Sequence, residues 1–546
     1  MGKKTVAIGV DGPNNSMIKE WLDQGLLPNL SSLRSESSSG VLVHHKKDSN
    51  ENSWIPFLTG RSLENIDYWI STYKPRTYEN SNASLYDLHD HQPFYALKDR
   101  ARVIMFDLPV AISSDVQGIQ VAGWASELNA VYPASEPASE LERIHETYGM
   151  DPKLGGAMEF HDNQSDRDGV SYRVPSLYNI DGLKSFRDKL LSSIATRGKI
   201  CREFIRRDDW DLFLSAFCEI HTAGHILWHL SQDHPLASMS QAFETDPLLA
   251  VYQAVDHEIG LIAEMVGRDD DLVLFSTDSL VTDCLENARS LFLPEFLYRW
   301  NFPGKAALAA GDPETDVPGL RFDYALHWKD EVWKLRTDHG DRQLQSPQEQ
   351  SANNETFNWQ PTNWFKPIWD QMKAFALPSN SDGYIRLNIK GREARGVVEP
   401  TDYQRICDEI SRSLSELVDA RTGRAMVERV IQTRSDPFEI DSRESAADLI
   451  VLWQEESPTD VAESPLVGRI GPVPYFRSGG HRKRGSRIEN FFMVRSPDCS
   501  SKKPFAEGRL EDLPATIVSR MGLAVPKHFE GRPLHFVNTG QDIANA

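Results

Sequence analysis

The chain of 546 residues carries 80 acidic and 59 basic side chains, which give a formal net charge of -21 at pH 7. Its length exceeds that of one ordinary domain, so we expect either several domains or one large domain with insertions. The negative charge opposes binding to a nucleic-acid backbone or to an anionic membrane unless basic residues are gathered locally.

The cysteines and the lengths of the apolar runs indicate in which cellular compartment the protein is found. The five cysteines are odd in number, widely spaced and form no CxxC pair, so neither a disulfide framework nor a zinc ribbon is indicated. The segment before Asp11 is too poor in apolar residues for a signal-peptide core, and no run approaches the roughly 18 apolar residues of a membrane span. A reducing, cytoplasmic location without membrane association is predicted, and the oligomeric state is left open.

Short β-branched apolar runs recur along the chain and predict buried parallel strands. They occupy residues 5–10, 101–107, 210–217, 271–277 and 447–453. Helical patterns lie between them, at residues 16–36, 185–207 and 248–267. This alternation predicts an α/β fold in which helices cover both faces of a mostly parallel sheet.

Two segments interrupt the alternation and predict the domain organisation. Residues 120–185 and 302–380 are rich in polar residues, proline and aromatic residues. We expect them to be insertions that cap a site, with surface loops or linkers as the alternative. The α/β core would then consist of residues 1–119, 186–301 and 381–546.

Polar residues follow the predicted strands where a ligand site is expected. Asp11, Asp107 and Asp278 each come at the end of a strand, and the segment FCEIHTAGHILWHL follows another. In a parallel α/β sheet, ligands collect beyond the C-terminal ends of the strands.

His221 and His225 are spaced four residues apart, so both lie on one face of a predicted helix, about 5–6 Å apart at Cβ. Two imidazoles at this spacing suit one zinc ion, although three histidines on an ordinary helix would look the same. His229, one turn further on and beside Trp228, is expected to pack in the core. Asp11 and Asp278 either cap the following helices or bind a cation.

A glycine-rich segment near the C-terminus supplies a third histidine. His481 follows Gly479 and Gly480, which permit close approach of the backbone. Arg482, Lys483 and Arg484 come next and are expected to meet a small anionic substrate, with a solvated turn as the alternative.

Taken together, these motifs resemble the alkaline phosphatase superfamily, in particular the branch of type I phosphodiesterases and nucleotide pyrophosphatases. The resemblance spans most of the chain. The segments that carry it are VAIGVDGPNNSMIKEWLDQGLLPNLSSLRSESSSGVL, WIPFLTGRS, HTAGHILWHL, LVLFSTDS, YIRLNIKGREARGVVEP, ADLIVLW, GGHRKRG and LEDLPATIVSRMGLAVPKHFEGRPL.

The resemblance implies an α/β/α sandwich with two metal ions above the strand ends. One ligand set becomes His221, His225 and His481, with His221 where this family commonly has aspartate. Three imidazoles remain a sound zinc set with an open fourth position.

The second ligand set implied by the resemblance is depleted. Asp11 and Asp278 match, but Ser279 stands where a histidine is expected. The nucleophile position falls on Asn50, with Ser49 beside it and Ser53 one turn further on. An amide cannot form a covalent phospho-intermediate. Because this set lacks two ligands while the tri-histidine set is complete, we predict one tightly held zinc ion and a weak or absent second ion.

Three functions are compatible with this pattern. The first is a metal-dependent hydrolase or transferase acting on a phosphate, phosphonate or sulfate ester. In that case Asp11 or Asp278 would hold a second ion or act as a base, Arg482 or Arg484 would neutralise charge, and Ser49 would replace the nucleophile if the loop is shifted by one residue.

The second is a repurposed mononuclear zinc enzyme that uses direct water attack, elimination or group transfer, with Asn50 orienting the substrate or stabilising an oxyanion. The third is a non-catalytic protein that keeps the fold.

Overall fold

A computed structural model was used to describe the chain. It describes residues 3–45, 53–62, 65–66, 71–82, 91–125, 133–154, 175–308, 332–333, 335–337, 344–353, 355, 357–358, 360–379, 381–439, 446–483 and 485–536. Asn50, Ser49 and Arg484 lie outside the described residues, as do large parts of the cap segments predicted at residues 120–185 and 302–380.

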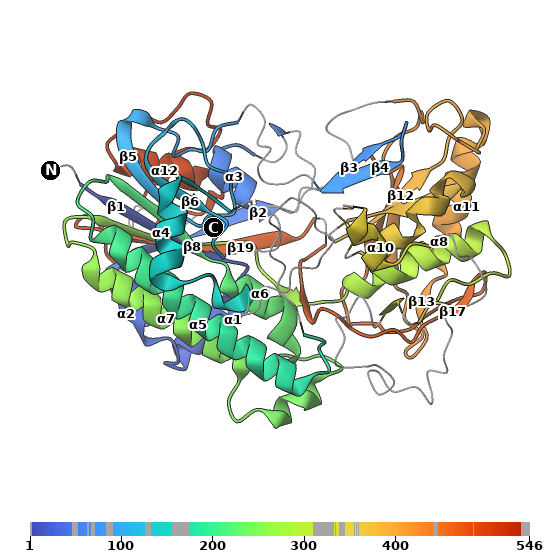
Figure 1. The fold of residues 1–546 in the computed structure, drawn as a ribbon, viewed down its shortest axis with the longest axis horizontal. Helices are drawn as coiled ribbons and strands as arrows, with labels where there is room; N and C mark the ends of the chain where they lie inside the picture. Colours follow the sequence, from blue (N-terminus) through green and yellow to red (C-terminus); the bar gives the residue numbers. More distant parts are fainter. Residues whose placement is uncertain are drawn as a thin grey trace, which may run out of the picture.

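The chain has an α/β fold arranged in two lobes (Figure 1). Within the described residues, nine strands form the sheet of the first lobe in the order β20-β2-β19-β9-β1-β8-β5-β6-β7. Their bounds are Thr5–Asp11 (β1), Ser38–His45 (β2), Lys98–Phe106 (β5), Val116–Ala122 (β6), Ala134–Glu136 (β7), Leu212–Phe217 (β8), Asp271–Thr277 (β9), Arg487–Arg495 (β19) and Gly508–Arg509 (β20).

The central strands of this sheet are parallel, as predicted. Strand β1 pairs in parallel with β8 and β9, and β5 pairs in parallel with β8 and β6. Strand β19 runs antiparallel between β9 and β2. The predicted strands at residues 5–10, 101–107, 210–217 and 271–277 are therefore confirmed.

Helices cover both faces of the sheet, which gives three layers (Figure 1). Side chains alternate between faces along a strand, so Val6, Ile8 and Val10 of β1 pack into one core and Ala7 into the other. The first core takes helices Asn15–Asp23 (α1), Pro28–Glu36 (α2), Ser139–Tyr148 (α4), Ile180–Ile205 (α5), Glu219–Leu227 (α6) and Pro247–Met265 (α7). The opposite core takes Trp54–Thr59 (α3) and Asp512–Arg520 (α12).

The second lobe is built on an antiparallel sheet with the order β11-β12-β15-β14. The strands are Ala374–Leu377, Gly383–Leu387, Leu449–Trp453 and Val427–Gln432 for β11, β12, β15 and β14. The remaining strands are Ser71–Lys74 (β3), Glu79–Asn82 (β4), Val281–Thr282 (β10), Val418–Asp419 (β13), Ala462–Ser464 (β16), Gly468–Ile470 (β17) and Gly479–Gly480 (β18).

Three further helices, Leu293–Asn301 (α8), Pro347–Ala352 (α10) and Tyr403–Ser415 (α11), lie in the second lobe. Short helical turns occur at Pro152–Leu154, Trp228–Leu230, Ala237–Ala242, Ala288–Phe292, Pro361–Gln371 and Pro400–Asp402.

One strand prediction is corrected by this lobe. Residues 447–453 were expected to form a parallel strand of the main sheet, but β15 is antiparallel and belongs to the second sheet. Every residue of β15 is buried. A continuous apolar run indicates that both faces of a strand are buried but not the direction of the neighbouring strands. The sequence at this position therefore does not reveal to which of the two sheets the strand belongs.

The main sheet presents a polar edge at the C-terminal ends of β1, β8 and β9. Asp11 is the last residue of β1, Asp278 follows β9, and α6 begins two residues after β8 ends. Among the described residues, no helix combines the length and apolar character needed to cross a membrane.

Candidate metal centre

Helix α6 places His221 and His225 on the same face, above the C-terminal end of β8. The helix is buried along most of its length, including Ala223 and Gly224. A Cβ atom on Gly224 would lie 2.5 Å from Cδ1 of Leu280. A larger residue at position 224 would have to displace the buried side chain of Leu280, so glycine lets α6 lie close to the segment that follows β9.

His481 is brought to the same place by a short antiparallel ladder. Strand β18 pairs with β10, with Gly480 opposite Val281 and Gly479 opposite Thr282. A Cβ atom on Gly479 would lie 2.3 Å from the carbonyl oxygen of Gly224. The backbone of β18 thus touches the backbone of α6, and the residue after β18 is His481.

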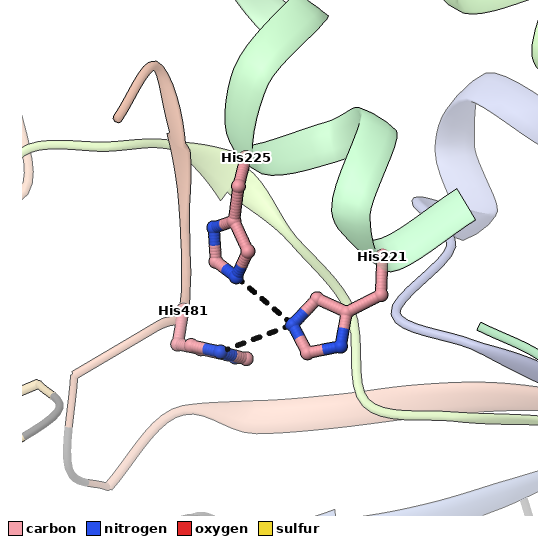
Figure 2. Close-up of side chains that lie close together, drawn as sticks. All are labelled: His221, His225 and His481. Carbon is pink, nitrogen blue, oxygen red and sulfur yellow. Dashed lines mark hydrogen bonds between the residues drawn. The ribbon is translucent and has the colours of Figure 1, made fainter. Parts of the chain in front are cut away.

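The three histidines converge through their Nε2 atoms (Figure 2). Nε2 of His225 lies 2.9 Å from Nε2 of His221, which lies 3.3 Å from Nε2 of His481. The three residues form a group of possible ligand atoms that all lie within 4.8 Å of one another. His225 is buried, and the other two rings are partly exposed.

The opposite ring nitrogens contact oxygen acceptors. Nδ1–H of His225 donates to the carbonyl oxygen of Gly479 at 2.7 Å, and Nδ1–H of His221 donates to Oδ2 of Asp11 at 2.8 Å. Nδ1 of His481 lies 2.9 Å from Oδ2 of Asp278, an ion-pair distance that is not aligned as a hydrogen bond. Oxygen partners of this kind fix the ring orientation in metal-binding histidines.

This arrangement creates a need for a cation. A carbonyl oxygen can only accept, so His225 carries its proton on Nδ1 and presents a lone pair at Nε2. The same holds for His221 beside the Asp11 carboxylate. Two lone pairs 2.9 Å apart repel unless a proton or a metal ion lies between them.

Protonation is disfavoured at His225. Burial, followed by the charges of Arg477 and the neighbouring histidines, holds the pKa of His225 well below its usual range. Tetrahedral zinc with bonds of about 2.0–2.1 Å to nitrogen requires ligand nitrogens roughly 3.3 Å apart. The spacing and chemistry of the three Nε2 atoms therefore fit a zinc ion.

Asp11 and Asp278, predicted as metal ligands, contact the Nδ1 atoms of His221 and His481, on the side of each ring opposite the converging Nε2 atoms. Oδ1 of Asp11 accepts hydrogen bonds from Nε1 of Trp54 at 3.0 Å and from Oγ1 of Thr277 at 3.1 Å, while Oδ2 faces His221. Asp278 has a left-handed backbone, with φ of 60°, and its Oδ1 accepts the N–H of Ser279 at 2.7 Å. Neither aspartate belongs to the group of converging nitrogens.

The other strand-end aspartate serves a different cluster. Asp107 accepts from Nη2 of Arg197 at 2.7 Å, and Arg197 donates through Nε to Glu219 at 2.9 Å. Glu219 is the first residue of α6. This buried network anchors the start of the helix that carries His221 and His225.

Two basic residues near the histidines are placed by the structure. Arg482 is half-buried, and no carboxylate in the described part of the chain pairs with it. Lys483 instead pairs with Glu428, and its backbone N–H donates to Glu455 at 2.6 Å. Arg477, which the sequence did not single out, lies 3.5 Å from Glu286 and contributes to the low pKa of His225.

His229 lies outside the converging group. It is fully buried, with Nδ1 3.0 Å from Oγ of Ser478. Burial, with a smaller effect of His234, lowers the pKa of His229 to about 3.

Trp54 and Thr277, the partners of Asp11, were not predicted as site residues. Thr277 is the last residue of β9, so its position at a strand end could have identified it from the sequence. No local sequence pattern marks Trp54.

Comparison with known proteins adds little beyond this geometry. No model of a protein family matches the sequence, and no curated protein matches it. Solved structures align over nearly the whole chain. An inactive form of murine ectonucleotide pyrophosphatase/phosphodiesterase 5 in complex with AMP is 11% identical, with 96% of each chain covered and a TM-score of 0.44.

Its human counterpart is 10% identical, with 96% of each chain covered and a TM-score of 0.45. Phosphonoacetate hydrolase from Sinorhizobium meliloti 1021 in complex with phosphonoformate is 12% identical, covers 95% of this chain and 96% of that one, and has a TM-score of 0.41. At these values the likeness assigns neither an activity nor a ligand to this chain.

Proposed function

We propose that this chain is a metal-dependent hydrolase or transferase that acts on a phosphate, phosphonate or sulfate ester and uses one zinc ion held by His221, His225 and His481. The observation that carries the proposal is the convergence of the three Nε2 atoms while each Nδ1 contacts an oxygen. The anionic substrate class is supported by Arg482 beside His481 and by the motifs that resemble type I phosphodiesterases.

Zinc bound in a site of this kind supplies Lewis acidity to an ester oxygen and to water. The protein supplies orientation. Asp11 and the carbonyl oxygen of Gly479 hold the rings of His221 and His225 with their Nε2 atoms inward, and Asp278 faces Nδ1 of His481. Arg482 offers a positive charge to a non-esterified oxygen of the substrate.

The engagement of both aspartates favours a single ion. Both oxygens of Asp11 accept hydrogen bonds within the protein, and both oxygens of Asp278 face partners. A second ion would have to displace these contacts. We propose direct attack by water, without a covalent phospho-intermediate, because the amide of Asn50 at the nucleophile position cannot form such an intermediate.

Metal content and turnover test the proposal together. We expect purified protein to contain about one zinc ion per chain and to hydrolyse at least one ester in a panel of p-nitrophenyl phosphate, bis-p-nitrophenyl phosphate, p-nitrophenyl phenylphosphonate and p-nitrophenyl sulfate. His225→Ala should lose the zinc and the activity, whereas the exposed His257→Ala should keep both. Two ions, one of them lost in Asp278→Ala, would contradict the single-ion proposal; no metal in the wild-type protein would contradict the zinc enzyme altogether.

A further inference from the structure

A hydrogen-bonded chain of buried side chains lies at the end of β2. Oγ of Ser53 is 3.2 Å from Nε2 of His44, and Nδ1 of His44 is 3.1 Å from Nδ2 of Asn490. Their exposed fractions are 6%, 9% and 1%. We name Ser53, His44 and Asn490 the serine array.

The direction of the hydrogen bonds in the serine array follows from Asn490. Its Nδ2 also approaches the carbonyl oxygen of Leu42 at 3.3 Å, which can only accept, so the amide nitrogen and not the amide oxygen faces this side. The same NH₂ group donates to Nδ1 of His44, and His44 in its neutral form must then carry its proton on Nε2. That proton is donated to Oγ of Ser53.

The hydroxyl hydrogen of Ser53 is consequently directed away from His44. Within the described residues, His44 is the one hydrogen-bond partner of the Ser53 side chain. The hydroxyl is buried and its lone pair is occupied by His44, while its hydrogen meets no acceptor among the described residues; such a hydroxyl is a donor prepared for a ligand oxygen.

Sheet topology places the serine array at the edge that carries the histidines. Strands β2, β19, β9 and β1 are consecutive neighbours. Asn490 lies opposite Leu42 on one side, and the β19–β9 register, with Phe492 opposite Phe275, brings Asn490 level with Thr277 on the other.

Thr277 and Trp54 are the two residues that hold Oδ1 of Asp11. Ser53 and Trp54 are adjacent in the chain, so one segment contacts both His44, through Ser53, and Asp11, through Trp54. Asp11 in turn accepts the hydrogen bond from His221.

We propose that Ser53 donates a hydrogen bond to a non-esterified oxygen of the tetrahedral anion that binds at the histidine centre. His44 and Asn490 are positioning residues that set the direction of this bond. The inference rests on the proposed function for the identity of the substrate as a phosphate, phosphonate or sulfate ester. It gives Ser53 the role of a donor and not of a nucleophile, because a serine nucleophile needs a base that accepts its proton.

One isosteric substitution separates these two roles. In Asn490→Asp, the carboxylate would accept a hydrogen bond from Nδ1–H of His44, and Nε2 of His44 would then be an acceptor toward Ser53. The hydroxyl hydrogen of Ser53 would then turn toward His44 and be lost to the anion. If Ser53 is a hydrogen-bond donor to the anion, this substitution removes its function. If Ser53 is a nucleophile, the substitution gives it a base and raises its reactivity.

The experiment measures affinity for inorganic phosphate by calorimetry on zinc-loaded protein, together with kcat/KM for the best ester. We expect Ser53→Ala to weaken phosphate binding by about 10-fold and to lower kcat/KM by about 100-fold, as for loss of one donor to a developing oxyanion. Asn490→Asp should reduce both by similar factors, Ser53→Thr should stay within about 3-fold of wild type because it keeps the hydroxyl, and zinc content should be unchanged in all three.

Three results would overturn the role of Ser53. They are phosphate affinity and turnover in Ser53→Ala equal to wild type, activity in Asn490→Asp at or above wild type, and a wild-type protein that binds no phosphate. A wild-type protein that binds phosphate but hydrolyses no ester would instead refute the proposed function, and the phosphate affinities of the variants would still decide the role of Ser53.

Discussion

The two lobes each bury a dense cluster of polar groups. The clusters differ in whether their hydrogen-bonding groups and charges find partners within the protein. In the second lobe, the buried carboxylate of Asp448 receives two hydrogen bonds from Arg392, both at 2.7 Å, and one from the backbone N–H of Leu387 at 2.8 Å. Burial alone would raise the pKa of Asp448, but Arg386, Arg392 and Arg434 lower it. Every charge in this cluster meets its opposite.

The histidine centre of the first lobe is organised in the opposite way. Its carboxylates and carbonyl oxygen lie behind the rings, and the front presents acceptors that face one another. The comparison indicates that density of buried polar groups does not reveal a functional site. The informative property is a group of side chains whose hydrogen-bonding and charge needs the protein itself leaves unmet.

Breaking the satisfied cluster should have the largest effect on stability. Arg392→Met removes the bidentate partner of Asp448 and leaves the buried carboxylate with only the longer ion pairs to Arg386 at 4.0 Å and Arg434 at 3.9 Å. We therefore expect the free energy of unfolding to fall by about 3–5 kcal/mol. Urea denaturation followed by tryptophan fluorescence measures this. Lys390→Met, which breaks an exposed pair with Glu399, should cost less than about 1 kcal/mol; equal effects of the two variants would contradict the assignment.

Filling the unsatisfied cluster should stabilise the protein. Zinc that binds the folded chain alone adds about 2.7 kcal/mol when its free concentration is 100 times Kd. Thermal unfolding in EDTA and in zinc should therefore differ in Tm for wild type and for His257→Ala, but not for His225→Ala. The absence of a shift in wild type would show that the three nitrogens do not hold zinc.

Weakening the support behind one ring should have a smaller effect. Asp278→Asn removes the charge that faces Nδ1 of His481, and asparagine tolerates the left-handed backbone of this position. We expect zinc affinity to fall by about 10- to 100-fold, measured by competition with a chelating dye. The exposed Asp269→Asn is the matched control, and a complete loss of zinc would mean that Asp278 is itself a ligand.

A buried histidine outside the centre should affect stability only at acidic pH, and have no effect near neutral pH. Burial lowers the pKa of His234 to about 4, whereas an unfolded histidine titrates near 6.5, on the order of the model-peptide value. Between these values the unfolded chain binds more protons, so stability falls as pH falls, by about 1.4 kcal/mol per pH unit for this group.

Urea unfolding of the metal-free protein between about pH 6.5 and 4 tests this. His234→Asn should flatten the pH dependence, while His257→Asn should leave it unchanged. An unaltered slope in His234→Asn would mean that His234 is accessible to protons in the folded state.

Most of the first lobe was accessible to sequence reasoning because its signals are local. Apolar runs mark buried strands, the spacing of His221 and His225 marks one helix face, and strand ends mark the ligand edge. The same reasoning pointed to Asp11, Asp278 and His481, which the structure brings to one place.

What the sequence did not reveal depends on distant contacts. Strand β15 is as apolar as the main strands, and its sheet is decided by pairing with β12 and β14. The position of Asp11 behind His221, and not in front, follows from hydrogen bonds with Trp54 and Thr277 that join residues far apart in the chain. Ser53, His44 and Asn490 carry no shared local pattern, so their hydrogen-bonded chain is visible only in three dimensions.

The contact between Gly479 and Gly224 also bears on how the centre is held together. Because the two backbones touch there, the distance between α6 and the strand that leads to His481 is set by backbone contact and not by flexible side chains. A side chain larger than hydrogen at position 479 would push the strand away from α6. The glycine thus keeps His481 close enough to α6 for its imidazole to meet those of His221 and His225.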